Sequence, residues 1–271
     1  MARKPTEEYM SMTSDLEDRL HNAINISGNA ARMAMSHFRN VSNIMMKADQ
    51  SPVTIADTQT EQVIRNGLAR KYPSETLFGE ELGYSGDSTN FWIIDPIDGT
   101  RSFITGLPLF GMLLGYITLQ GPQLGIIRMP ALDEVYTGAV DRGATCNGEA
   151  ISVSDCKSLS SARLFINEAD KLAVQEETAF SHLINSGELR RLGADCYSHA
   201  LVARGLADAV VDYDLQPYDY LPVSAVVNAA GGIMTDWQGN ALTMQSDGRT
   251  LTAATPELHN ELMALVNDRK D

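Results

Sequence analysis

Cysteine is scarce in this sequence: three of the 271 residues are Cys, and none stands in the C-x-x-C spacing of metal and redox motifs. This odd number (Cys146, Cys156 and Cys196) argues against a disulfide framework and suits a reducing compartment. Long apolar runs are missing as well. None approaches the roughly 20 residues of a membrane helix, and the N-terminal stretch lacks the apolar core of a signal peptide. We therefore expect a cytoplasmic protein with no membrane partner.

Positively charged residues are also scarce. Lys and Arg number 21 against 35 Asp and Glu, which gives a formal net charge of −14. Patches of Lys and Arg bind nucleic-acid backbones, so we expect no nucleic-acid partner, and cations would have to help in binding any anionic substrate. With 44% hydrophobic residues, the chain is otherwise typical of a globular protein with a sizeable core.

The N-terminal third predicts two helices. Apolar residues recur at helical spacing over residues 9–38, which indicates a long amphipathic helix. A second helix is predicted to open with a capping box formed by Thr58 and Glu61 and to end before Pro73. This places Asp57 just ahead of the second helix.

The rest of the chain predicts one set of hairpins and then a mixed region. From residue 103 to about 153, apolar runs are interrupted by Gly, Pro and an Asn-Gly pair, which favours antiparallel hairpins. Beyond residue 160, the patterns predict strands near 163–166, 208–213 and 232–237, and helices near 171–185, 196–204 and 217–230. No flexible linker divides the chain. We expect a single domain over 1–271, with closely packed α+β and α/β halves that meet near residue 155.

Two aspartates follow a buried apolar run in the stretch WIIDPIDGT. Asp95 and Asp98 flank Pro96, and such a turn can direct both carboxylates into one space. Gly99 and Thr100, which follow, leave backbone N–H groups free for an anion. Mg²⁺ suits this arrangement because it prefers oxygen ligands and usually takes a few carboxylates with water and substrate phosphate. The alternative is a solvated turn, since Asp, Pro and Gly all form turns readily.

Two further acidic segments stand at the ends of predicted elements. Glu80 and Glu81 follow a short apolar run, and Asp219 opens an otherwise apolar helix. Taken singly, adjacent glutamates are usually solvated, and an acid in the first turn of a helix complements the helix dipole. A metal cluster explains all three acidic segments together.

The succession of GEE, WIIDPIDGTRSF and an Asp opening a helix that ends in AAGG resembles the inositol monophosphatase family of metal-dependent, lithium-sensitive phosphomonoesterases. The likeness extends from residue 51 to residue 239. It implies an α/β fold, an alternating α/β/α/β/α layered sandwich, with two or three Mg²⁺ ions per active site and a homodimer. The resemblance implies as metal ligands Glu80, Asp95, the carbonyl of Ile97, Asp98 and Asp219, and as catalytic residues Asp57, Thr100 and Glu80.

These residues support hydrolysis by a metal-activated water. Mg²⁺ lowers the pKa of a bound water and neutralises charge on a phosphate. Thr100 would orient that water while its own hydroxyl donates to Asp57. No covalent phospho-enzyme is required. We therefore predict a Mg²⁺-dependent phosphatase acting on a small phosphate monoester.

Rival catalytic motifs are weak or missing. Ser198 and His199 are adjacent, but neighbours on a helix point in different directions, and no GxSxG elbow occurs. Cys196 is interpreted as a small core residue, and no GxxxxGK[ST] loop indicates a kinase. Two non-enzymatic alternatives stay open: a catalytically silent metal-binding or regulatory protein, and a structural protein with an acidic surface.

The substrate prediction depends on fewer residues. Pro217 and Tyr218 before Asp219, together with the stretch GADCYSHAL, resemble the histidinol-phosphate phosphatase branch of the family. L-Histidinol phosphate carries a cationic amine, for which Asp195 and Asp212 would supply the opposite charge. The predicted substrate-binding residues are Gly99, Thr100, Asp195, Asp212 and Asp219.

Both amine-binding assignments have a simpler alternative. Asp212 would be a solvated acid at a strand end, and Asp195 would be the N-cap of a helix that begins at Cys196. The alternative activities are those of an inositol-1-phosphate phosphatase, a broad-specificity phosphomonoesterase or a bisphosphate nucleotidase.

Overall fold

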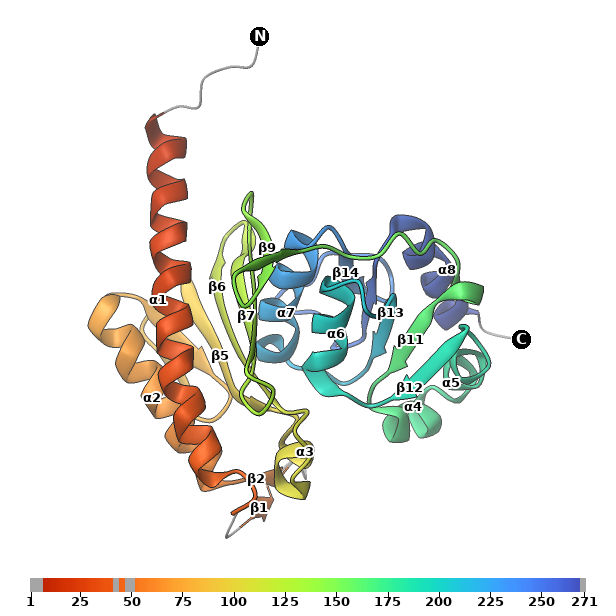
Figure 1. Cartoon of the computed structure of the whole chain (residues 1–271), viewed down its shortest axis with the longest axis horizontal. Coiled ribbons are helices and arrows are strands. Elements are labelled where there is room, and N and C mark those ends of the chain that lie inside the picture. The colour runs from red at the N-terminus through yellow and green to blue at the C-terminus, as the bar shows by residue number, and fades with distance from the viewer. Residues whose placement is uncertain (1–6, 41–43, 47–51, 269–271) are drawn as a thin grey trace.

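Two β-sheets alternate with three layers of helices in the computed structural model, which describes residues 7–40, 44–46 and 52–268 (Figure 1). The layers follow one another in the order helix, sheet, helix, sheet, helix. This order confirms the predicted α/β/α/β/α sandwich. Within the described ranges, no helix is long and apolar enough to cross a membrane.

The first sheet has eight strands in the order β10-β9-β8-β7-β6-β5-β3-β4, and only β3 and β5 run parallel to each other. Its strands are β3 (Thr76–Gly79), β4 (Gly83–Ser85), β5 (Phe91–Asp98), β6 (Gly111–Thr118), β7 (Gly121–Met129), β8 (Glu134–Ala139), β9 (Gly143–Cys146) and β10 (Glu149–Ile151). The predicted hairpins are therefore confirmed, except that Phe103 lies in a short helix, α3 (Thr100–Thr105). A small separate pair joins β1 (Met45–Met46) to β2 (Pro52–Val53).

Helices α1 (Glu7–His37) and α2 (Ile55–Lys71) cover the outer face of the first sheet (Figure 1). Side chains of α2, including Ile64 and Leu68, are fully buried against Trp92 and Ile94 of β5. Because helices cover both faces of the sheet, β5 is buried on both sides, which explains its continuous apolar run. Both N-terminal helices were predicted near these positions.

The start of α2 differs from the prediction. Thr54 is the N-cap: its Oγ1 accepts a hydrogen bond from Ala56 N (3.1 Å), and its own N–H donates to Asp57 Oδ2 (2.8 Å). The capping box predicted for Thr58 and Glu61 is therefore wrong, and Asp57 lies inside the first turn of the helix. Two consecutive Thr-x-x-acid patterns, at 54–57 and 58–61, compete here, and the helix begins at the first because β2 ends at the residue just before it.

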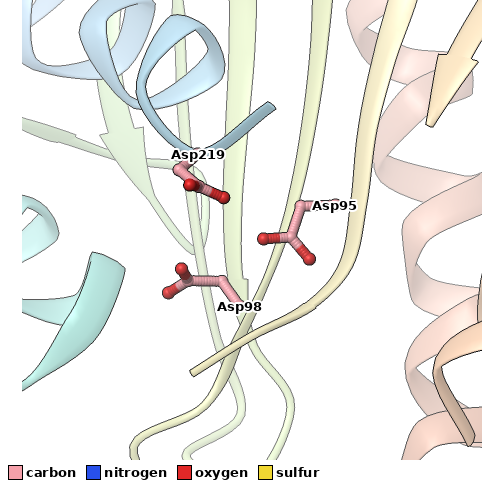
Figure 2. A group of neighbouring side chains, drawn as sticks. All are labelled: Asp95, Asp98 and Asp219. Atoms are coloured by element: carbon pink, nitrogen blue, oxygen red, sulfur yellow. The ribbon is translucent and has the colours of Figure 1, made fainter. Parts of the chain in front are cut away.

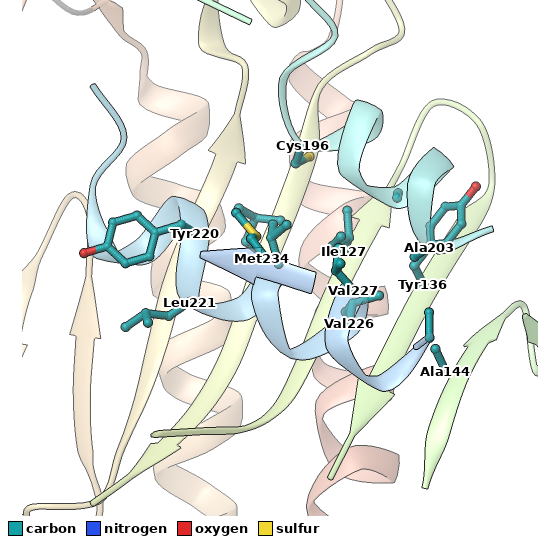
Figure 3. Packing of buried hydrophobic residues seen from close by; sticks show 14 of the residues in the cluster. Ile127, Tyr136, Ala144, Cys196, Ala203, Tyr220, Leu221, Val226, Val227 and Met234 are labelled. Atoms are coloured by element: carbon teal, nitrogen blue, oxygen red, sulfur yellow. The ribbon is translucent and has the colours of Figure 1, made fainter. Parts of the chain in front are cut away.

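The middle layer consists of α6 (Asp195–Ala203) and α7 (Pro217–Ala229). Figure 3 shows Val226 and Val227 of α7 among Ile127 and Tyr136 of the first sheet. Gly125 of β7 permits this close packing, because a Cβ at that position would overlap the carbonyl oxygen of Pro222. The close packing of α7 brings the beginning of this helix to the end of β5.

The second sheet has five strands in the order β12-β11-β13-β15-β14, namely β12 (Leu189–Leu192), β11 (Arg163–Ile166), β13 (Ala209–Asp212), β15 (Thr250–Ala253) and β14 (Ile233–Asp236). Its outer face is covered by α4 (Ala169–Gln175), α5 (Glu177–Ile184) and α8 (Pro256–Asn267). The helix predicted over 171–185 is thus two helices, because the chain breaks at Glu176, whose φ and ψ are −133° and 51°. The chain passes from the first sheet to the second between Ile151 and Arg163, around the predicted meeting point near residue 155.

Candidate active site

The end of β5 carries the two aspartates of the DPID segment. Along a regular strand, side chains three residues apart point to opposite faces of the sheet. Here Asp95 pairs with Leu113 of β6, whereas Asp98 pairs with Gly111, so that three steps on β5 match two on β6. This bulge adds one residue and brings both aspartates to the same side. The Ile97 N–H donates to Asp95 Oδ1 at 2.9 Å and fixes the turn.

A third carboxylate comes from the first turn of α7. Pro217 occupies the start of this helix, and the Gln216 N–H donates to Asp219 Oδ2 at 2.6 Å. Figure 2 shows Asp219 facing the two aspartates of β5, and each of the three offers an oxygen within 4.8 Å of the others. The predicted cluster of Asp95, Asp98 and Asp219 is therefore assembled by the fold.

These carboxylates share a strongly negative environment. Burial raises the pKa of Asp95 well above its usual range, and the charges of Glu80, Asp98 and Asp219 raise it further. Burial, followed by the charges of Asp98 and Glu80, likewise raises the pKa of Asp219. For Asp98, burial and then the charge of Asp195 raise the pKa to about 7. A cation bound among these groups would relieve this repulsion.

The donor set fits Mg²⁺. The three clustered aspartates offer carboxylate oxygens, which hard divalent cations prefer. Glu80 and Ile97 line the same space as the three aspartates. The residues that would hold the metal are Glu80, Asp95, Asp98, Asp219 and the carbonyl of Ile97.

The acidic cluster opens into a cavity of about 170 Å³. Its lining includes eight acidic residues, two cationic residues (Arg101 and Lys171) and one histidine (His199). The acidic residues are Glu80, Asp95, Asp98, Glu168, Asp195, Asp212, Asp214 and Asp219. Of the site residues predicted from the sequence, all except Asp57 line this cavity. A cavity with this excess of negative charge favours the binding of cations.

The predicted pair of Thr100 and Asp57 is placed differently. The Thr100 hydroxyl donates to the Ile97 carbonyl at 3.2 Å. The buried Asp57 carboxylate accepts hydrogen bonds from the N–H and the hydroxyl of Thr54, at 2.8 and 2.7 Å. The hydroxyl of Thr100 is therefore directed to the metal-site turn, and the role of the pair in orienting water stays a prediction.

Asp195 lies at the first position of α6. Its φ is 47°, a left-handed conformation that is uncommon for residues other than Gly, and its carboxylate makes no capping bond to the helix. Instead, Asp195 Oδ2 accepts from the Ser102 hydroxyl at 2.9 Å. A Cβ at Gly99 would lie 2.5 Å from this oxygen, so glycine is required beside it. The N-cap interpretation of Asp195 is therefore wrong; burial raises its pKa to about 6.

Asp212 lies at the end of β13 and is 3% exposed. Its carboxylate accepts three hydrogen bonds, from Asn167 Nδ2 (2.6 Å), His199 Nε2 (3.1 Å) and the Tyr213 N–H (2.9 Å). The interpretation of Asp212 as a solvated strand-end acid is therefore wrong. The second sheet and α6 bury it at the side of the cavity.

Comparisons with known proteins agree with this geometry. The model of the inositol monophosphatase family matches residues 15–271. The chain belongs to the inositol monophosphatase family. It is 35% identical over 261 residues to a histidinol-phosphatase of Chlorobaculum parvum, covering 95% of this chain and 98% of that one. It is also 35% identical over 254 residues to the chloroplastic bifunctional phosphatase IMPL2 of Arabidopsis thaliana, covering 92% and 73% of the two chains.

Solved structures of the family share the fold. An inositol monophosphatase from Zymomonas mobilis matches with a TM-score of 0.84 at 34% identity, covering 92% of this chain and 98% of that one. An IMPase from Thermotoga maritima matches with a TM-score of 0.85 at 28% identity, covering 93% and 97%. The predicted membership of the family is confirmed, and this inositol monophosphatase family member is a phosphoric monoester hydrolase.

Sequence reasoning missed several residues that line this cavity. Asn167 follows β11, and Asp212 ends its parallel neighbour β13, so that both lie at the same edge of the second sheet. The carboxyl ends of adjacent parallel strands are where ligands commonly bind, and this signal could have identified Asn167. Lys171 also lines the cavity, where its Nζ contacts Glu168 Oε2 (2.7 Å) and Asp214 Oδ2 (2.9 Å). No local pattern indicated this ion pair.

The rival nucleophiles are excluded by their contacts. Ser198 is buried, and its hydroxyl donates to the carbonyl of Asp195 at 2.8 Å. The imidazole of His199 contacts Asp212 and Thr252 instead of Ser198. Burial raises the pKa of the Cys196 thiol well above its usual range, so this cysteine is a core residue, as predicted.

Proposed function

We propose that this family member is a Mg²⁺-dependent phosphatase that hydrolyses L-histidinol phosphate to L-histidinol and phosphate. The observation that carries this proposal is the second acidic pair. Asp195 and Asp212 line the cavity in addition to the metal cluster, and they supply negative charge for which a neutral inositol ring has no use. The likeness to a histidinol-phosphatase over nearly its whole length supports the same substrate.

Different residues of the cavity bind the metal, the phosphate of the substrate and its amine. When bound, Mg²⁺ supplies Lewis acidity that activates water and neutralises charge on the phosphate. Glu80, Asp95, Asp98 and Asp219, with the Ile97 carbonyl, would hold it. The other residues act on the two ends of the substrate.

At the phosphate end, the backbone N–H groups of Gly99 and Thr100 at the start of α3 receive oxygens of the ester. Thr100 and Asp57 orient the attacking water. Asp195, which lies beside Gly99, and Asp212, at the edge of the second sheet, accept the ammonium group of the substrate, so that both the phosphate and the amine of the ester are held.

A second substrate class is favoured by one observation. Arg101 and Lys171 line the cavity and present positive charge beside the acids. A second anionic group on the substrate, as in a bisphosphorylated nucleotide, would pair with these two side chains. Both are already engaged: Arg101 with Glu168 and Asp170, and Lys171 with Glu168 and Asp214. This second candidate therefore ranks below an amine-bearing monoester.

We include in the proposal a single domain and a cytoplasmic location, as expected from the sequence, and a homodimer, as the family likeness suggests. Sedimentation of the purified protein tests the oligomeric state. A monomer across the micromolar range would remove the homodimer from the proposal without affecting the chemistry.

The substrate is tested by comparing kcat/KM for L-histidinol phosphate, inositol 1-phosphate and an adenosine bisphosphate, each with and without Mg²⁺. We expect L-histidinol phosphate to be the best of the three and every activity to require the metal. If inositol 1-phosphate is the better substrate, the histidinol assignment fails while the phosphatase assignment stands.

A further inference from the structure

A buried row of polar side chains stands behind Asp212. The imidazole of His199, on α6, lies between two groups of the second sheet: its Nε2 is 3.1 Å from Asp212 Oδ2, and its Nδ1 is 2.8 Å from the Thr252 hydroxyl. His199 is 2% exposed and Thr252 is fully buried. An imidazole with a partner on both ring nitrogens has a fixed orientation, with its Nε2–H directed at the carboxylate.

Asn167, which directly follows β11, holds the same carboxylate. Its Nδ2 donates to Asp212 Oδ2 at 2.6 Å and also contacts the carbonyl oxygen of Asp195 at 3.2 Å. Its Oδ1 accepts from the Ala194 N–H at 3.1 Å. One buried amide therefore connects the segment that carries Asp195 with the carboxylate of Asp212.

The row resembles a hydroxyl, imidazole and carboxylate triad, but its chemistry is different. Among the described residues that line the cavity are His199 and Asp212, whereas Thr252 is not one of them. The buried hydroxyl has no access to a substrate and cannot act as a nucleophile. The imidazole contacts the carboxylate that is predicted to receive the amine, so its effect passes through Asp212.

Asp212 also lacks an Arg or Lys partner among the residues that the structure describes. A buried carboxylate requires hydrogen-bond donors or a cation. Two side chains and a backbone N–H supply the donors on the protein side, and the cavity side is left for a cation from the substrate.

We propose that His199 and Asn167 are positioning residues for substrate specificity, which hold the Asp212 carboxylate in the orientation that receives the substrate's amine. This inference rests on the proposed function, since it concerns the same cavity. It predicts that disturbing the row changes the enzyme's preference for an amine-bearing ester, and not its general ability to hydrolyse phosphate esters.

Strand β15 offers a matched pair of variants. Thr250 and Thr252 both lie on β15 and are both fully buried. The Thr252 hydroxyl contacts His199, whereas the Thr250 hydroxyl has no hydrogen-bond partner among the described residues. Thr252→Val therefore releases the imidazole. Thr250→Val makes the same chemical change two residues away, opposite Asp212 on β13, but removes no hydrogen bond of the row.

The measurement is the ratio of kcat/KM for L-histidinol phosphate to kcat/KM for the same ester without its amino group. We expect Thr252→Val to lower this ratio about threefold and His199→Leu to lower it at least tenfold, mainly through KM for the amine-bearing ester. Thr250→Val should leave it unchanged. His199→Gln, which can place an N–H near the Nε2 position, should recover most of the wild-type ratio.

Direct binding gives a readout apart from turnover. The dissociation constant of L-histidinol is measured by calorimetry with Mg²⁺ and phosphate present. It should rise at least tenfold in His199→Leu and stay unchanged in Thr250→Val. If His199→Leu does not fold, Thr252→Val and Asn167→Ala carry the same comparison.

The two possible failures can be told apart. If the wild-type enzyme prefers the amine-bearing ester but Thr252→Val and His199→Leu lower both esters equally, the row is only structural and the inference is overturned. If the wild-type enzyme does not distinguish the two esters, the proposed substrate is wrong, and the inference fails with it.

Discussion

The two acidic ends of the cavity are built in different ways. At the end of β5, the buried Asp95 lies near the half-buried Asp98 and Asp219, and burial, followed by the charges of Glu80, Asp98 and Asp219, raises the pKa of Asp95. At the edge of the second sheet, Asp212 is buried to a similar degree but accepts hydrogen bonds from two side chains and a backbone N–H. The first end requires a metal to be stable in its charged form. At the second end, hydrogen bonds within the protein already hold the carboxylate in place, and only the charged group of a substrate has to be added.

The largest effect is expected at the metal end. Asp98→Asn should reduce kcat/KM by more than the roughly 10–100-fold that loss of an outer-shell partner costs at metal sites. The fold should persist, and the melting temperature without metal should rise, because one of the repelling charges is removed. Phosphate release and thermal melts with and without Mg²⁺ check both statements. Near wild-type turnover at low millimolar Mg²⁺ would remove Asp98 from the metal site.

At the substrate end the expected loss is smaller and selective. Neutralising both acids, as Asp195→Asn with Asp212→Asn, should lower kcat/KM for L-histidinol phosphate at least about tenfold, since charge-assisted hydrogen bonds are worth roughly 1.5–3 kcal/mol. An uncharged monoester of similar size should change much less. Kinetics on the two substrates separate recognition from chemistry, and an equal fall in both would show that these acids have a structural or metal-supporting role.

Much of the metal end could be predicted from the sequence, whereas at the second end the sequence indicated the two acids but not the residues that hold Asp212. Asp95 and Asp98 are three residues apart and Asp219 opens a recognisable helix, so local patterns indicated each carboxylate, and the family resemblance joined them in one cluster. Asn167 and Asp212 are 45 residues apart and meet only because β11 and β13 pair. No period or turn signal encodes that contact, and the burial of Asp212 follows from strand pairing and from the packing of α6.

The water-orienting residues should show a third kind of effect. Thr100→Ala and Asp57→Asn should each lower kcat with little change in KM, because neither side chain is expected to hold the substrate. Their double variant should lose less than the product of the single losses, since members of one unit are non-additive. Melts are needed as a control, because Asp57 also caps α2. Fully multiplicative losses would show that the two residues act separately.

The smallest effect is expected at His259, a histidine that does not line the cavity. Burial lowers the pKa of His259, whose Nε2 lies 2.7 Å from the Thr235 hydroxyl. The unfolded chain therefore binds a proton more readily, and the free energy of unfolding should fall as pH drops through the ordinary histidine range near 6.5. His259→Gln should make this decline shallower in urea titrations at pH 7.5 and 5.5. An unchanged slope would mean that other groups control acid stability.

The most direct test of the two-ended site uses the unmodified enzyme with L-histidinol phosphate and its amine-free analogue at saturating Mg²⁺. We predict at least a tenfold higher kcat/KM for the amine-bearing ester and loss of both activities when a chelator removes the metal. Equal kcat/KM for the two esters would contradict amine recognition by Asp195 and Asp212, and turnover that survives chelation would contradict the metal site.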